Sequence, residues 1–161
     1  DIVADWQSHK MKEKNRHSVL EGLPASTPSL LYAFLLGQRA ATHGFDWPDA
    51  HQALKKVEEE LDEFQLALQS GGKEEIAEEL GDLLFSLSQV ARLLGHNPEI
   101  VLRDANKKFE KRFRQMEREI KKKGKNLGNC SAEELDWAWE KIKEHKVKDS
   151  PSAKRPKNKK N

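Results

Sequence analysis

The fold is decided by residues 49–94, which read DAHQALKKVEEELDEFQLALQSGGKEEIAEELGDLLFSLSQVARLL. Apolar residues recur in this stretch at spacings of three and four, once before Gly71 and again after Gly72, which is the period of an α-helix. Because a two-glycine connection is short, the two helices should be antiparallel neighbours, and the stretch predicts a helical hairpin. The apolar positions expected to face inward are Trp47, Ala50, Leu54, Val57, Leu61, Phe64 and Leu68, then Ile76, Leu80, Leu83, Leu84, Leu87, Val90 and Leu94.

Helical patterns continue on both sides of this hairpin. One helix is predicted over residues 27–43 and another over residues 98–123, the second with Asn97 as its N-cap. A short helix should follow Ser131, which forms a capping-box pair with Glu134. The expected buried side of the helix over 98–123 consists of Leu102, Ala105, Phe109, Phe113, Met116 and Ile120. No stretch alternates apolar and polar residues as a half-buried strand does, so we predict an all-α fold, an antiparallel helical bundle.

Length and charge limit the domain organisation. The 161 residues suit one folded domain, which we place over residues 25–146. Residues 147–161 form a basic tail that is predicted to be disordered. With six Lys/Arg and one Asp the tail has a net charge of +5, which leaves −3 for the rest of the chain, so nucleic-acid binding is not expected of the folded part. The start at Asp1 rather than Met predicts a fragment or a processed form. A cytoplasmic protein is expected, since no membrane span or export signal is present and the single Cys130 fits a reducing compartment.

Two pairs of carboxylates lie at matched places on the two hairpin helices. Glu60 and Glu63 are three residues apart, as are Glu79 and Asp82, so each pair shares one helix face. If the chain reverses at Gly71, Glu60 lies opposite Asp82 and Glu63 lies opposite Glu79. Four like charges at the edge of a core repel one another unless a cation lies between them, and such oxygen ligands suit Mg²⁺ or Mn²⁺. The alternative is a pair of ordinary solvated acidic faces.

Basic residues on the predicted helix over 98–123 could complement these acids. Lys108 and Arg112 are four residues apart and flank its apolar stripe. A carboxylate-held metal beside lysine and arginine suits a polyphosphate, because phosphoryl transfer depends mainly on charge neutralisation and positioning. The alternative is that these cations are solvated and pair with Glu110 or Glu119 on the same helix.

From about Trp6 to Lys143 the sequence resembles the MazG family of nucleoside triphosphate pyrophosphohydrolases. The resemblance is carried by GFDW (44–47), KVEEELDE (56–63), EELGDLLF (78–85), ANKKFEKRF (105–113) and the helix around Trp139. It implies an all-α bundle that forms a homodimer, binds ATP and other nucleoside triphosphates, and hydrolyses them with Mg²⁺ to the monophosphate and pyrophosphate. Many bacterial members carry two such domains. This chain is most similar to the second, with residues 1–24 as the lead-in from the first.

The resemblance also implies roles for individual residues. The metal-binding acids of the family match Glu60, Glu63, Glu79 and Asp82. The positions that hold the nucleotide and its phosphates match Lys56, Glu59, Glu75, Lys108, Arg112 and Trp139. Lys108 and Arg112 would contact phosphates, and Glu59 is a candidate acceptor for the proton of the attacking water. Trp139 is a candidate wall for stacking the base, although a single tryptophan on a short helix is more often part of a core.

Three other functions stay open at this point. A narrower all-α pyrophosphohydrolase would act on dUTP, dCTP or phosphoribosyl-ATP. A non-catalytic helical interaction module would carry the acids only as solvated faces. A nucleic-acid binder would work through the basic tail and show salt-sensitive binding. The sequence also leaves open the base and sugar preference, the phosphorus attacked and the number of metal ions.

Overall fold

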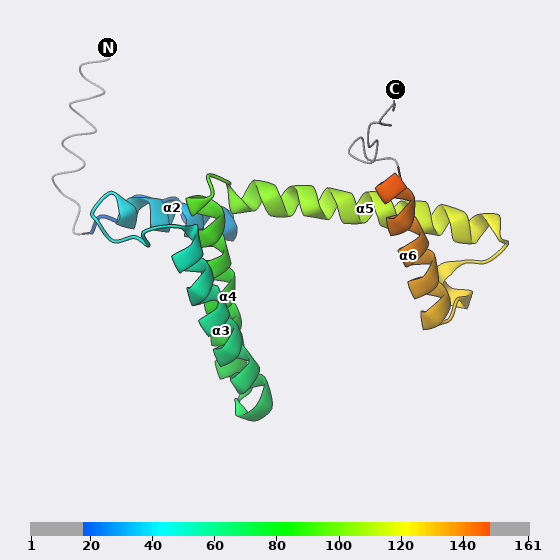
Figure 1. Ribbon diagram of the computed structural model, residues 1–161, viewed down its shortest axis with the longest axis horizontal. Coiled ribbons are helices and arrows are strands. Elements are labelled where there is room, and N and C mark those ends of the chain that lie inside the picture. Colours follow the sequence, from blue (N-terminus) through cyan, green and yellow to red (C-terminus); the bar gives the residue numbers. More distant parts are fainter. Residues whose placement is uncertain (1–17, 149–161) are drawn as a thin grey trace, which may run out of the picture. The chain divides into compact units, whose positions relative to one another are not determined.

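A computed structural model describes the backbone of residues 18–148 and the side chains of residues 18–143. This part contains helices α2 (Ser29–Ala41), α3 (Ala50–Ser70), α4 (Lys73–Leu93), α5 (Pro98–Lys122) and α6 (Ala132–Lys148), with a 3₁₀-helix at Leu127–Asn129 (Figure 1). No strand occurs within residues 18–148, so the predicted all-α class is confirmed there. Within the same range, no helix has the length and apolar character that a membrane span requires.

The predicted terminal segments lie largely outside the described residues. Of the lead-in over residues 1–24, the first 17 residues are not covered, and of the basic tail over 147–161, only the first two residues are, as the end of α6. The boundaries of the domain predicted over residues 25–146 remain a prediction.

The described chain forms two compact units that divide after Leu102. In the first unit, α3 and α4 lie side by side as the predicted hairpin, and α2 packs against α4 (Figure 1). The turn between α3 and α4 requires a residue without a side chain, because a Cβ on Gly71 would lie 2.6 Å from the carbonyl oxygen of Ala67. Glycine at this position therefore ends α3 and lets the chain reverse closely enough for the two helices to pack.

Side-chain caps determine where two of the helices begin. Asp49 accepts a hydrogen bond from the backbone N–H of Gln52 (2.9 Å) at the start of α3. At the start of α6, the backbone N–H of Glu134 donates to Ser131 Oγ (3.3 Å), and the backbone N–H of Ser131 donates to the Glu134 carboxylate (3.0 Å). The predicted capping box is thus present, and α6 begins where the sequence indicated.

A buried polar network joins α2, α4 and the loop before α3. Gln89 is fully buried; its amide nitrogen donates to the carbonyl oxygen of Ala33 (2.8 Å), and its amide oxygen accepts from Arg92 Nε (2.8 Å). Arg92 also forms an ion pair with Asp46, and this hydrogen-bonded guanidinium lowers the pKa of the Asp46 carboxyl. A Cβ at Gly37 would lie 1.8 Å from the Gln89 side chain, so glycine there allows α2 to approach α4. The network holds α2, α4 and the loop before α3 together at the end of the hairpin that is opposite the Gly71 turn.

Many of the leucines predicted to face inward are exposed in the single chain, so that part of the prediction is wrong. The buried side chains of α3 and α4 are mostly small or polar, namely Ala53, Val57, Glu60, Ala67, Ser86, Ser88 and Gln89. The exposed leucines are Leu54, Leu61, Leu68, Leu80, Leu84, Leu87 and Leu94. Two helices of a hairpin cover only the faces they turn toward each other, and small side chains let them approach closely. The apolar periodicity therefore predicts which faces of the helices are apolar. It does not show which of these faces are buried within a single chain.

The second unit has its own small core. Met116 and Ile120 on α5 pack with Ile142 on α6, and Trp139 lies partly buried against them. Phe109, which was predicted to line the buried side of α5, is instead 56% exposed. Only the C-terminal half of α5 is therefore covered within this unit.

Candidate metal and nucleotide site

Three carboxylates of the α3–α4 hairpin lie together. Oxygen atoms of Glu60 on α3 and of Glu79 and Asp82 on α4 are within 4.8 Å of one another. Glu79 and Asp82 share a face of α4 because they are three residues apart, and the turn at Gly71 brings Glu60 to the same height. Glu60 is buried, Glu79 is half-buried and Asp82 is exposed, so the group lies at the edge of the hairpin core. The proximity of Glu60 to Glu79 and Asp82 agrees with the hairpin register predicted from the sequence.

The negative charges around Glu79 are crowded. Burial raises the pKa of the Glu79 carboxyl above its ordinary value of 4.5, and the charges of Glu63, Asp82, Glu60 and Glu78 raise it further. Glu63, the fourth predicted metal ligand, does not belong to the group of three in the described structure, yet it is the strongest of these charged neighbours. The structure thus gathers three of the four predicted acids and places the fourth beside Glu79.

A lysine one turn earlier on α3 contacts the same group. The ammonium of Lys56 lies 2.8 Å from a carboxylate oxygen of Glu60 and 2.9 Å from one of Glu59, and these hydrogen-bonded carboxylates raise the pKa of Lys56. Sequence reasoning assigned Lys56 and Glu59 to the nucleotide and missed the contact between Lys56 and Glu60. The four-residue spacing between them was the available signal.

The three carboxylates fit a hard divalent cation. Mg²⁺ binds oxygen ligands at about 2.0–2.1 Å with octahedral geometry, which places neighbouring ligand oxygens roughly 3 Å apart. Oxygens already within 4.8 Å of one another reach that spacing through small side-chain movements. The group offers only carboxylate oxygens, the ligands that suit Mg²⁺ and Mn²⁺ rather than softer metals.

The residues predicted to hold the nucleotide lie on several helices. Glu75 is exposed in the first turn of α4, and Lys108 is exposed on α5. Arg112 is half-buried on α5, and its Nε atom is buried without a hydrogen-bond partner among the described residues. Buried polar groups are normally paired, so this guanidinium nitrogen is a donor whose partner an anionic ligand could supply.

Trp139 contributes to packing in the second unit. Its ring lies 5.2 Å from that of Phe109, centroid to centroid, and it is packed against the core residues of α5 and α6. A structural role is therefore evident for Trp139. Stacking of a nucleotide base on it stays a prediction.

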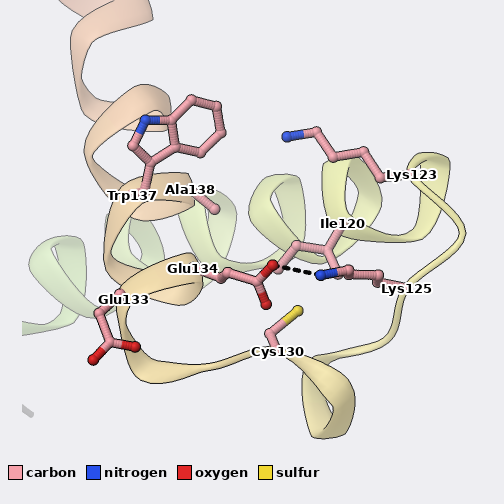
Figure 2. Close-up of a pocket in the computed structure, with 8 residues that line it drawn as sticks. All are labelled: Ile120, Lys123, Lys125, Cys130, Glu133, Glu134, Trp137 and Ala138. Atoms are coloured by element: carbon pink, nitrogen blue, oxygen red, sulfur yellow. Dashed lines mark hydrogen bonds and ion pairs between the residues drawn. The ribbon is translucent and has the colours of Figure 1, made fainter.

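A pocket of about 430 Å³ lies in the second unit, beside the start of α6 (Figure 2). Ile120, Cys130 and Trp137 are among the residues that line it, and Lys125 forms an ion pair with Glu134 there (Figure 2). None of the residues assigned to the metal or the nucleotide lines this pocket. It is therefore distinct from the site predicted from the sequence.

Comparison with known proteins finds a matching domain and similar relatives. Residues 49–116 match the MazG nucleotide pyrophosphohydrolase domain. The chain is 35% identical over 152 residues to an Escherichia coli protein named nucleoside triphosphate pyrophosphohydrolase, an alignment that covers 91% of this chain and 58% of the relative. It is 38% identical over 140 residues to a Thermotoga maritima protein named nucleoside triphosphate pyrophosphohydrolase/pyrophosphatase MazG, with 86% of this chain and 54% of the relative covered.

The chain spans little more than half the length of these two relatives, with 58% and 54% covered. The part that matches the domain includes the three clustered carboxylates of Glu60, Glu79 and Asp82 as well as Lys108 and Arg112. The two relatives extend the similarity over most of this chain. Residues 49–116 thus match the MazG domain, and the chain is similar to these two relatives over most of its own length.

Proposed function

We propose that this protein hydrolyses nucleoside triphosphates, in the ribo or deoxyribo form, to the monophosphate and pyrophosphate with Mg²⁺. The observation that carries the proposal is the group of carboxylates from Glu60, Glu79 and Asp82 inside the segment that matches the MazG domain. The names of the two relatives support the substrate class. We assign the activity to the removal of unwanted nucleotides from the cytoplasmic pool.

We assign metal binding to the acids of the hairpin and phosphate binding to the cations of α5. Glu60, Glu79 and Asp82, with Glu63 beside them, would hold the metal. At these residues, bound Mg²⁺ would neutralise phosphate charge and would make water a stronger nucleophile. Lys108 and Arg112 donate hydrogen bonds to phosphate oxygens, which hold the triphosphate in position and balance its charge.

The reaction breaks the anhydride bond between the α- and β-phosphates. The oxygen of a water molecule forms a new bond to one of the two phosphorus atoms, and the bridging oxygen leaves with the other phosphoryl group. The water gives up a proton, for which Glu59 is the assigned acceptor because its exposed carboxylate is one residue from Glu60. Nucleoside monophosphate and pyrophosphate are the products.

Product analysis tests this function directly. Each ribonucleoside and deoxyribonucleoside triphosphate is incubated with the protein and Mg²⁺, and phosphate, pyrophosphate and nucleotides are separated by ion-exchange chromatography. We expect equal amounts of monophosphate and pyrophosphate, and none when EDTA replaces Mg²⁺. Release of inorganic phosphate with nucleoside diphosphate would contradict the proposed bond cleavage. Turnover of dUTP or dCTP alone would indicate the narrower pyrophosphohydrolase, and no turnover would favour the interaction module.

We also propose that the protein is a homodimer whose partners cover the leucine faces of α3 and α4. Leu54, Leu61 and Leu68 are spaced by seven residues and are all exposed, while the largest fully buried side chains among the described residues are Gln89 and Ser88. Fully burying an exposed leucine contributes about 1.5–3 kcal/mol, and covering one that is 41–56% exposed contributes roughly half of that, so several together favour association. A second copy of the chain offers the same apolar faces, as a two-fold symmetric interface requires.

Replacing Leu68 by glutamate should therefore shift the protein from dimer to monomer. The carboxylate would be buried without a partner at the dimer interface, which is unfavourable. Multi-angle light scattering at micromolar concentration should give twice the 18.5 kDa chain mass for the wild type and for the control Gln52→Glu, which adds the same charge to an exposed position on the side of α3 opposite the leucine face. A wild-type protein of monomeric mass would rule out the dimer.

A further inference from the structure

Glu60 belongs to two different arrangements at once. One of its carboxylate oxygens lies 2.8 Å from the ammonium of Lys56, and the same carboxylate contributes to the group it forms with Glu79 and Asp82. The Glu60 side chain is only 8% exposed, whereas that of Lys56 is 35% exposed. The more exposed Lys56 ammonium therefore contacts a Glu60 carboxylate that is buried in the hairpin.

A buried carboxylate needs a positive partner, because leaving water costs a charged group far more than a neutral one. Among the described side chains, Lys56 is the one cation that forms an ion pair with any of the four predicted metal ligands. Its single positive charge offsets only part of the negative charge of Glu60, Glu63, Glu79 and Asp82. The group remains strongly attractive to a divalent cation.

The pair between Lys56 and Glu60 is suited to being broken. A lysine four residues before a glutamate is the less favourable order for a helical ion pair, since it opposes the helix dipole. Mg²⁺ carries twice the charge and approaches carboxylate oxygens to about 2.1 Å, closer than the 2.8 Å of the lysine ammonium. We infer that Lys56 is an internal counter-ion that occupies Glu60 in the metal-free protein, and that Mg²⁺ must displace it to bind. This inference rests on the proposed Mg²⁺-dependent function.

Displacement has a measurable consequence for metal affinity. Removing Lys56 removes a competitor for Glu60, so Lys56→Met should bind Mg²⁺ more tightly without nucleotide. Removing any lysine from α3 also lowers the repulsion felt by a cation, and Lys55→Met controls for this effect. Lys55 is the preceding residue, is exposed, and forms no ion pair with the four acids among the described side chains. The difference between the two variants therefore isolates the contact with Glu60.

Isothermal titration of Mg²⁺ into the nucleotide-free wild type and both variants tests the inference. We expect the dissociation constant of Lys56→Met to be about two- to fivefold lower than that of Lys55→Met, the factor by which one partly exposed ion pair shifts an equilibrium. In EDTA, Lys56→Met should also melt at a lower temperature than Lys55→Met, because Glu60 then lacks its partner. Equal or weaker Mg²⁺ binding by Lys56→Met would overturn the counter-ion role.

The outcomes for this inference and for the proposed function differ. If the wild type and both variants fail to bind Mg²⁺, the metal-dependent function fails and the counter-ion role with it. If the wild type binds Mg²⁺ and the two variants bind it equally, only the counter-ion role is wrong. If Lys56→Met does not fold, a measurement on the wild type still tests the inference. In protein labelled with ¹⁵N-lysine, the Lys56 ammonium signal, assigned with Lys56→Arg, should move toward those of exposed lysines on Mg²⁺ saturation; an unmoved signal contradicts displacement.

Discussion

Glu79→Gln and Glu63→Gln should each lose nearly all hydrolytic activity, about 100-fold or more, while melting in EDTA at the same temperature as the wild type or higher. Glutamine keeps the shape of the side chain and removes one negative charge. The activity falls because a metal ligand is lost. The metal-free fold is stabilised because either replacement removes repulsion between Glu79 and the like charges that raise its pKa. The wild type should instead gain stability from Mg²⁺ with nucleotide, since a ligand that binds only the folded state stabilises it.

The pH dependence in EDTA provides a check on the physical cause. A carboxyl whose pKa is raised by folding stabilises the folded state fully only below its unfolded pKa, and this contribution is lost as the pH rises through the folded value. Glu79 is such a group. The melting temperature of Glu79→Gln should therefore exceed that of the wild type most clearly near neutral pH. The difference should shrink as the pH falls and Glu79 itself becomes neutral.

Glu58→Gln is the matched control for these variants. Glu58 is an exposed acid on α3 and is not among the charges that raise the pKa of Glu79. Its replacement should leave turnover and the effect of Mg²⁺ on the melting curve close to those of the wild type. Full activity in both Glu63→Gln and Glu79→Gln would show that these acids are solvated faces and would remove the metal site from the proposal.

Arg112→Ala and Lys108→Ala should each lower kcat/KM by about ten- to 100-fold, with the helical content unchanged. Loss of a charged hydrogen-bond donor to phosphate costs roughly 1.5–3 kcal/mol of binding in the transition state. Arg112 carries the stronger expectation, because its buried Nε atom has no partner within the described structure. Steady-state kinetics with Mg²⁺ and circular dichroism measure the two quantities.

Lys107→Ala is the control for the two α5 variants. Lys107 is exposed and directly precedes Lys108 on the same helix, but it is neither three nor four residues from Lys108 or Arg112 and so does not share their face. Its removal should change kcat/KM less than twofold, because it takes away charge without taking away a phosphate contact. Wild-type kinetics in both Lys108→Ala and Arg112→Ala would contradict the phosphate role.

Much of the local structure of this chain was predictable from sequence spacing. Helix positions followed from apolar periodicity, from the glycines at positions 71 and 72, and from caps such as Ser131 with Glu134, all of which act over a few residues. The proximity of Glu60, Glu79 and Asp82 was also predictable, since a two-residue turn leaves the hairpin few possible registers. The resemblance to the MazG domain followed from the same residues. Local interactions therefore determine the helices and the height of the acids along the hairpin.

Tertiary structure decided which charges and which apolar faces meet. The sequence alone could not show that Ala53 and Ala67 are buried while Leu61 is exposed, because both kinds of residue recur with the same helical period and only packing selects the covered face. It likewise could not show that Lys56 pairs with Glu60, since a lysine side chain on a helix can reach several neighbours and its choice depends on their burial. The spacing of residues determined where the carboxylates lie along the chain. Burial of Glu60 beside the half-buried Lys56 was decided only when the two helices packed.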